Sequence, residues 1–241
     1  MRYGIISDIH ANLEALTAVI DALQSQRIDG YLCCGDIIGY AANPHECMEL
    51  VKSLHALCVA GNHDWAAIDK MDMSWFSFSA QKALEWTKQQ LTKDDGDFLR
   101  SLKLIVKTDD FILVHSGLQE AERFHYIYSI NQALGMFSLI DRKLCLVGHT
   151  HAPTIFKKAA SYIDMVGSFE FALENDCQYI VNVGSVGQPR DYDPRAAFGI
   201  FDSVTKTISI KRVPYDIRRA QEKIIAAGLP QSLAERLAIG R

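Results

Sequence analysis

The chain lacks several features that would assign it to a specialised class of protein. Its 241 residues contain no apolar run of about 18, so no membrane-spanning helix is expected. Its six cysteines show no CxxC spacing, which argues against a zinc knuckle and against a disulfide framework. A basic excess is also missing, because 25 Lys and Arg stand against 29 Asp and Glu. This balance argues against a general nucleic-acid binder.

Sequence signals for a domain boundary or for export are missing as well. We find no internal repeat, no low-complexity tract and no Gly/Ser linker. The N-terminal residues enter a strand-like run without the pattern of a signal peptide. These observations predict one domain over residues 1–241, located in the cytoplasm. With 49% hydrophobic residues, a chain of this length has the material for a sizeable core.

The first third of the sequence alternates strand-like and helix-like segments. Short apolar runs at 3–7, 31–34 and 57–60 predict strands. Between them, the apolar spacing over 12–24 predicts a helix, and Asn43-Pro44 is typical of the start of another. This alternation favours a largely parallel sheet.

The remaining two thirds predict further helices and strands. Residues 74–102 have helical spacing, 105–114 resemble a hairpin, and 144–147 form one more strand-like run. The β-rich stretch 153–211 is expected to supply a second sheet, and a helix with Ile217, Ala220 and Ile224 on one face follows it. The predicted fold class is α/β, with two packed sheets and outer helices.

Polar residues gather just past the ends of the predicted strands. Five of the eight histidines lie at such ends, which makes a scattered structural origin for them improbable. The residues are Asp8, His10, Asp36, Asn62, His63, Asp64, His115, His149 and His151. In open α/β sheets, ligands bind outside the carboxyl ends of the strands. Each histidine taken alone would more often be structural, but together these residues predict one site.

The residue types suit a pair of metal ions. Imidazole and carboxylate together favour zinc, iron, manganese, cobalt or nickel over calcium. The absence of cysteine from the set argues against a closed structural zinc site. Two ions about 3.5–4 Å apart would clamp a phosphoryl oxygen and generate a hydroxide nucleophile near neutral pH. The sequence therefore predicts a metal-dependent hydrolase of phosphate esters.

Five short motifs carry a resemblance to a known family. D-x-H, G-D, G-N-H-D, V-H-S-G and G-H-T-H, in that order, resemble the calcineurin-like metallophosphoesterases. Residues 7–16 and 184–191 are similar to its small bacterial branch, often labelled phosphodiesterase or diadenosine-tetraphosphatase-like. The resemblance extends from Tyr3 to Asp216 and implies a four-layer αββα sandwich with two mixed sheets.

The resemblance also implies a role for each matching residue. Asp8, His10 and His151 would hold the first metal, and Asn62, His115 and His149 the second, with Asp36 bridging both. Asn62 and His63 would contact the phosphate, and His63 would protonate the leaving oxygen. Asp64 would either orient His63 as part of the catalytic group or cap the following helix. Val183 departs from the pattern, because related sequences commonly have proline there.

Arg190 has two competing interpretations. It lies in a loop rich in glycine and proline, where its guanidinium would bind a substrate phosphate through two hydrogen bonds. Alternatively, it forms a structural salt bridge with Asp191 or Asp193. The sequence favours neither interpretation.

Other candidates favour structural interpretations. We expect His45, His55 and His125 to be structural or exposed. Hydrophobic packing is favoured over nucleobase stacking for the aromatic group of Trp65, Trp75, Phe76 and Phe78. The basic residues near the C-terminus alternate with acidic ones, which is typical of a solvated helix face.

The function that these residues predict is hydrolysis of small, nucleotide-like phosphate esters. Neither the choice between mono- and diesters nor the identity of the two metals follows from the sequence, and the oligomeric state is equally open. The alternative is a catalytically silent binding scaffold of the same fold, but a scaffold is free to lose ligands and all seven are present. A nuclease would need a basic groove, so no stable nucleic-acid complex or membrane partner is expected.

Overall fold

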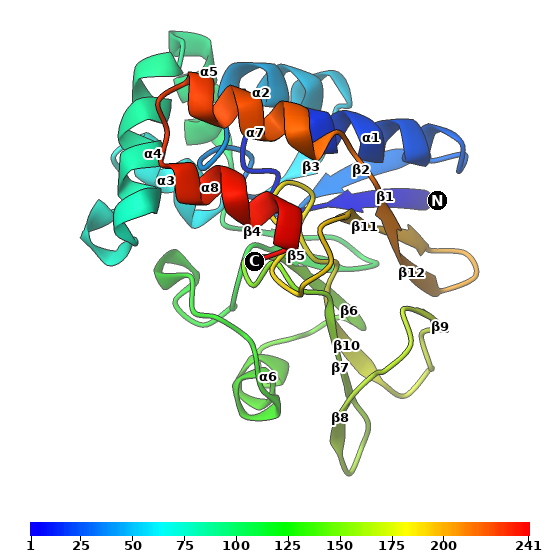
Figure 1. The fold of residues 1–241 in the computed structure, drawn as a ribbon. Coiled ribbons are helices and arrows are strands. Elements are labelled where there is room, and N and C mark those ends of the chain that lie inside the picture. Colours follow the sequence, from blue (N-terminus) through cyan, green and yellow to red (C-terminus); the bar gives the residue numbers. More distant parts are fainter.

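Two six-stranded sheets packed face to face form the centre of the computed structural model, which describes all 241 residues (Figure 1). The first sheet has the order β3 (Leu57–Cys58), β2 (Gly30–Cys33), β1 (Arg2–Ile6), β11 (Ala196–Asp202), β12 (Thr207–Val213) and β9 (Glu170–Ala172). The second has the order β4 (Ile105–Lys107), β5 (Ile112–Val114), β6 (Leu144–Val147), β10 (Gln178–Asn182), β7 (Thr154–Lys158) and β8 (Ile163–Met165).

Each sheet contains three neighbouring parallel strands. In the first sheet, β2 pairs in parallel with both β1 and β3. In the second sheet, β6 pairs in parallel with both β5 and β10. The other ladders are antiparallel, so both sheets are mixed. The loops that carry the predicted site residues all follow these parallel strands.

Helices cover the outer faces of both sheets (Figure 1). On the side of the first sheet lie α1 (Leu13–Gln24), α2 (Pro44–Ser53), α3 (Asn62–Ala67), α4 (Phe78–Gln90), α5 (Lys93–Ser101), α7 (Ile217–Ala226) and α8 (Gln231–Glu235). On the outer face of the second sheet lies α6 (Ile130–Phe137). Three 3-10 turns complete the chain: η1 (Met73–Trp75), η2 (Ala121–Arg123) and η3 (Arg236–Ile239). The predicted order of helix, sheet, sheet and helix is confirmed.

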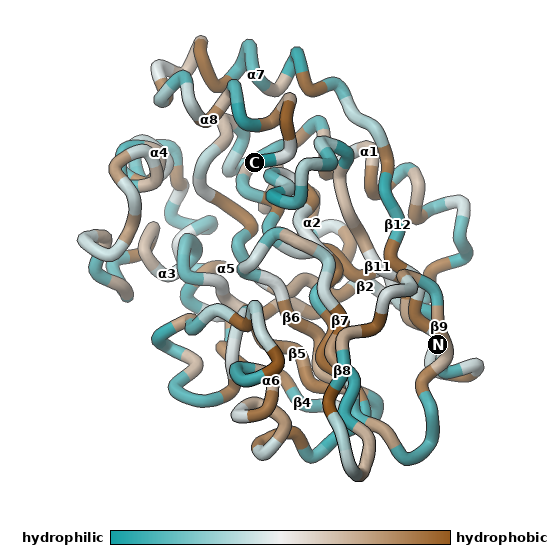
Figure 2. Tube along the Cα trace, turned by 60° about the horizontal axis from the view of Figure 1, so that its bottom comes forward, coloured by the Kyte–Doolittle hydropathy of each residue, from teal (hydrophilic) through white to brown (hydrophobic).

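The alternation of side chains along the strands separates three apolar layers. Ile5 points into the core between the sheets, whereas Ile6 packs against the helices over the first sheet. In the same way Leu146 faces the other sheet, and Val147 faces α6. Figure 2 shows hydrophobic residues concentrated along the strands and hydrophilic ones along the outer loops. No helix is both long and apolar enough to cross a membrane.

Two predictions about elements need correction. The stretch 153–211 does not supply the second sheet alone, because β9, β11 and β12 return to the first sheet and β11 pairs antiparallel with β1. The helical stretch 74–102 is divided between η1, α4 and α5. Thr92 ends the run, because its hydroxyl accepts from the main-chain NH of Asp95 while the Asp95 carboxylate accepts from the NH of Thr92.

Candidate metal centre

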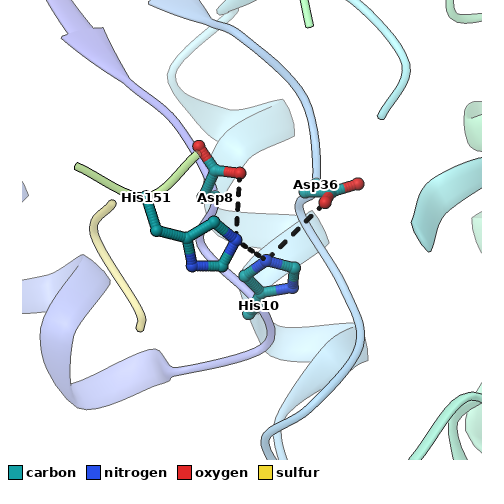
Figure 3. A group of neighbouring side chains, drawn as sticks. All are labelled: Asp8, His10, Asp36 and His151. Carbon is teal, nitrogen blue, oxygen red and sulfur yellow. Dashed lines mark hydrogen bonds and ion pairs between the residues drawn. The ribbon is translucent and has the colours of Figure 1, made fainter. Parts of the chain in front are cut away.

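Loops from both sheets meet at one edge of the sandwich. Those after β1, β2 and β3 belong to the first sheet, and those after β5 and β6 to the second. They bring together two buried groups of ligand atoms, each group within 4.8 Å. The first group is Asp8, His10, Asp36 and His151, drawn in Figure 3, and the second is Asp36, His115 and His149.

The Asp36 carboxylate is common to both groups. Its Oδ2 lies 3.6 Å from Nε2 of His10 and 3.3 Å from Nε2 of His115. Its Oδ1 accepts a hydrogen bond from the main-chain NH of His63 at 2.8 Å. A side chain at Gly61 would overlap with this carboxylate, so the loop after β3 can approach Asp36 this closely only with glycine at that position. One carboxylate therefore lies where it can contact an ion in either group.

Hydrogen bonds to main-chain carbonyls orient three of the imidazoles. Nδ1 of His10 lies 3.1 Å from the oxygen of Ile38, and Nδ1 of His115 lies 2.7 Å from that of Cys34. Nδ1 of His151 lies 2.6 Å from the oxygen of Gln188. Because a carbonyl only accepts, each Nδ1 carries a proton and Nε2 is the nitrogen left to bind a metal. All three Nε2 atoms face the site.

The donor set fits divalent transition-metal ions. Nε2 of His151 lies 3.0 Å from Nε2 of His10 and 3.4 Å from Oδ1 of Asp8 (Figure 3). Two imidazole lone pairs and a carboxylate facing one another inside the protein are unfavourable unless a cation lies among them. In the second group, Oδ1 of Asn62 lies 3.2 Å from Nε2 of His115 and adds an amide oxygen. Both groups therefore offer mixed nitrogen and oxygen donors.

Backbone strain is concentrated at the same residues. Asp8, His10, Asp36, His149 and His151 all have positive φ angles, between 51° and 71°. Such conformations cost about 1–3 kcal/mol each outside glycine and persist only where the surroundings enforce them. Here the loops support one another, because the NH of His10 donates to the oxygen of Asp36 and the NH of His149 donates to the Asp8 carboxylate.

Burial and mutual charge shift the pKa values of the site. Burial raises the pKa of Asp8 to about 6 and lowers the pKa values of His10, His149 and His151. Burial also acts to lower the pKa of His115, but the neighbouring Asp36 charge outweighs it and raises this pKa to about 9. Three of the imidazoles are thus kept neutral, which is the form that binds metals.

Asp64 is predicted either to orient His63 or to cap the following helix, and its hydrogen bonds are those of a cap. Its carboxylate accepts hydrogen bonds from the main-chain NH groups of Asp36, Ile37 and Gly61, each at 2.9 Å. It therefore caps α3 and ties the loop after β3 to the loop after β2. It does not orient His63 by a hydrogen bond, because Nδ1 of His63 has no partner.

A cavity of about 340 Å³ adjoins the candidate metal centre. Asn62, His63, His149 and Arg190 lie in its wall. The Nη2 of Arg190 donates to the Tyr40 hydroxyl at 3.2 Å and to Oε1 of Gln188 at 3.0 Å, while its Nε has no partner.

The salt-bridge interpretation of Arg190 is wrong for both candidate partners. Asp191 pairs with Arg212, and Asp193 pairs with Arg195. Contact between Arg190 and a substrate stays a prediction.

The remaining histidines lie outside the site, as expected. His45 is exposed and pairs with Asp95 at 2.9 Å, and His55 and His125 are exposed. A third group of possible ligands, His45, Glu49 and Asp95, already contains a cation, because the amine of Lys52 lies 2.8 Å from Glu49.

The packing interpretation of the aromatic group is only half correct. Trp65 packs edge-on against Phe124, and Phe76 packs against His63. Trp75 and Phe78, in contrast, are 83% and 71% exposed. Trp75 lies in the wall of the cavity.

Three cavity residues carried no signal in the sequence. Tyr40 contacts both His10 and His63, with ring centroids 4.6 and 4.5 Å away. Tyr126 stacks on His149 at 3.9 Å, and Arg236 reaches the cavity from η3. None belongs to a ligand motif, and Arg236 is distant in sequence from every other member of the site.

Comparisons with known proteins identify one family and several structures of similar fold. Residues 1–206 match the model of the calcineurin-like phosphoesterase superfamily domain. An uncharacterized protein of Methanocaldococcus jannaschii is 39% identical over 242 residues, which cover 99% of this chain and 98% of that protein. The crystal structure of a metallophosphoesterase from Sphaerobacter thermophilus is similar with a TM-score of 0.88 and 38% identity, covering 100% and 99% of the two chains.

A more distant structure shares the fold alone. A hypothetical protein from Pyrococcus horikoshii has a TM-score of 0.82 at 18% identity, with 100% of this chain and 98% of that chain covered.

Replacing the shared carboxylate should affect both metal groups. We expect Asp36→Asn to lower metal content at both sites, because an amide brings no negative charge to either ion. Elemental analysis after loading with Mn²⁺ measures this, with Asp97→Asn on the exposed face of α5 as the matched control. Two ions per chain at unchanged affinity in Asp36→Asn would show that the bridging assignment is wrong.

Proposed function

Because this chain belongs to the calcineurin-like phosphoesterase superfamily, we propose that it hydrolyses small phosphate esters with two divalent cations bound at the candidate metal centre. The observation that carries the proposal is the position of Asp36, whose single carboxylate is within reach of two separate buried groups. In the proposal, Asp8, His10 and His151 complete the first site, and Asn62, His115 and His149 complete the second.

The two cations, when bound, supply Lewis-acid stabilisation of a phosphoryl oxygen and activation of an attacking water. The chain's own part is to position the phosphate and move a proton. Asn62, His63 and Arg190 line the same cavity, which supports a role for all three in contacting the phosphate. A guanidinium fork matches two phosphate oxygens and stabilises charge that builds up on them.

His63 is the proposed proton donor. Its ring lies between Tyr40 and Phe76, with centroids 4.5 and 5.0 Å away. Burial lowers its pKa to about 4, so the ring is neutral at pH 7 without substrate. An anionic phosphate beside the ring favours the protonated form. We therefore expect His63 to take up a proton as substrate binds and to give it to the leaving oxygen.

The proposed substrates are nucleotide-like. Trp75 supports this, because a large aromatic side chain that is 83% exposed in the cavity wall offers a surface on which a base can stack. The volume of about 340 Å³ suits a small ligand and not a nucleic-acid duplex.

The His63→Ala variant should retain its metal ions, but its kcat should fall. General acid catalysis contributes about 10²–10⁴-fold, and most where the leaving group is poor. We expect a smaller loss of kcat on p-nitrophenyl phosphate than on an alkyl phosphate, because p-nitrophenolate leaves without help. His55→Ala, at an exposed position, serves as the control. Equal losses on the two esters would contradict a proton-donor role.

Arg190→Ala should reduce turnover without unfolding the protein. A charge-assisted hydrogen bond contributes about 1.5–3 kcal/mol, so kcat/KM should fall about 10- to 150-fold at constant metal content. Arg190→Lys should retain more of the wild-type kcat/KM than Arg190→Ala but not all of it, because an ammonium lacks the planar fork. Arg195→Ala is the control, since Arg195 pairs with Asp193 at the surface. A lower melting temperature with unchanged kinetics would instead assign Arg190 a structural role.

Trp75→Ala should affect only substrates that carry a base. Stacking on an aromatic side chain contributes about 1–3 kcal/mol per base, or about 5- to 150-fold in kcat/KM. The comparison uses the p-nitrophenyl ester of thymidine 5′-monophosphate and methyl p-nitrophenyl phosphate, which share a leaving group. Phe78→Ala is the matched control, because Phe78 is exposed but outside the cavity. A similar loss on both esters would argue against a base site at Trp75.

A further inference from the structure

The C-terminal segment 217–241 supplies part of the cavity wall. It lies beyond residue 206, where the match to the superfamily model ends. Figure 1 shows it in red and orange, folding back across the face of the molecule toward the loops of the metal centre. Leu233 and Leu237 are buried in one apolar cluster with Tyr40, and the NH of Tyr192 donates to the oxygen of Gly240 at 2.9 Å. Arg236, at the start of η3, is thereby held in the cavity wall.

The charge of this wall is unusual for the chain. The whole protein has a net charge of −4, yet the cavity is lined by three arginines and by no Asp or Glu. Arg123 is neutralised, because its Nε lies 3.1 Å from Glu120. Neither Arg190 nor Arg236 forms an ion pair with an Asp or Glu side chain. The cavity wall therefore carries two guanidinium groups without a directly paired side-chain carboxylate.

These two guanidiniums share one aromatic ring. The Cζ of Arg190 lies 5.7 Å from the centroid of Tyr40, and the Cζ of Arg236 lies 6.0 Å from it. Burial and the Arg190 charge lower the pKa of Arg236, so the two cations oppose each other. The Nε of Arg236 donates to the main-chain oxygen of Arg241, and its two terminal nitrogens have no hydrogen-bond partner in the protein. An anion between or beside these groups would relieve the repulsion and use the free donors.

The two arginines differ in their distance from the metal centre. Arg190 adjoins it, because its NH donates to the oxygen of His151 at 3.1 Å and its charge acts on His10, His63 and His149. Arg236 has only Arg190 and Tyr40 as charged or ionisable neighbours that shift its pKa. Arg190 therefore lies beside the metal centre, and Arg236 lies in the same cavity wall at the start of η3.

We propose that Arg236 and Tyr40 form a subsite for a second phosphate group of the substrate, separate from the phosphate held at the metal centre. The substrate class is then phosphate esters in which two or more phosphate groups are linked, with Arg190 contacting the first and Arg236 the next. This inference rests on the proposed function. It assigns to the C-terminal segment the selection of polyphosphate over monophosphate ligands, through the fork geometry by which guanidinium binds phosphate.

Isothermal titration calorimetry on the Mn²⁺-loaded full chain tests the subsite without requiring turnover. The two ligands are inorganic phosphate and a tripolyphosphate analogue whose bridging oxygens are replaced by methylene groups, so that it resists hydrolysis. For Arg236→Gln we expect Kd of the analogue to rise about 10- to 150-fold, and Kd of phosphate to change by less than about twofold. Arg236→Lys should recover part of the affinity. Arg218→Gln, at an exposed position of α7, should match the wild type.

Each outcome separates this inference from the proposed function. Unchanged affinity for the analogue in Arg236→Gln, or an equal loss for both ligands, would overturn the subsite. If Arg236→Gln were unfolded, Arg236→Lys would take its place, with a smaller rise in Kd expected for the analogue and again little change for phosphate. Failure of inorganic phosphate to bind the Mn²⁺-loaded wild type would instead count against the proposed function, whereas a dependence of analogue binding on Arg236 would still support the subsite.

Discussion

The close approach of imidazole lone pairs and carboxylates at the edge of the sandwich is the constraint on which the rest of the structure depends. Nε2 atoms of His10 and His151 lie 3.0 Å apart, and the Asp36 carboxylate lies beside His10 and His115. Such an arrangement is unfavourable in a protein interior without cations. Several features outside the ligand set serve to maintain it. Asp64 ties two loops together, and Gly61 permits contact with Asp36. Within the candidate ligand set, five residues adopt strained backbone conformations.

The sandwich explains how ligands from distant parts of the chain reach one point. A single parallel sheet would present its loops in one row, whereas two packed sheets present two rows that face each other. Asp8 and Asp36 come from the first sheet, and His115, His149 and His151 come from the second. The C-terminal segment then closes one side of the adjoining cavity and adds a positive charge that neither sheet supplies.

The sequence predicted the ligand loops well because their signal is local. A short apolar run followed by a polar motif, as at Ile6–Asp8 or Val147–His149, marks a strand end, and parallel strands place such ends together. Contacts distant in sequence left no such signal. Two examples are the pairing of β11 with β1 and the contact of Arg236 with Tyr40. In both, the partners are separated by more than 150 residues, so only the tertiary fold brings them together. The exposure of Trp75 was not predictable either, because an aromatic residue in the sequence is compatible both with a buried core position and with the exposed rim of a cavity.

The central claim is that two cations share the Asp36 carboxylate. Anomalous diffraction from crystals grown with Mn²⁺, measured at the manganese edge, tests it most directly. If the carboxylate is shared, two strong peaks per chain are expected, about 3.5–4 Å apart, with the Asp36 carboxylate between them. One of them should lie among Asp8, His10 and His151, and the other among Asn62, His115 and His149. A single peak, or two peaks of which one is remote from Asp36, would contradict the account.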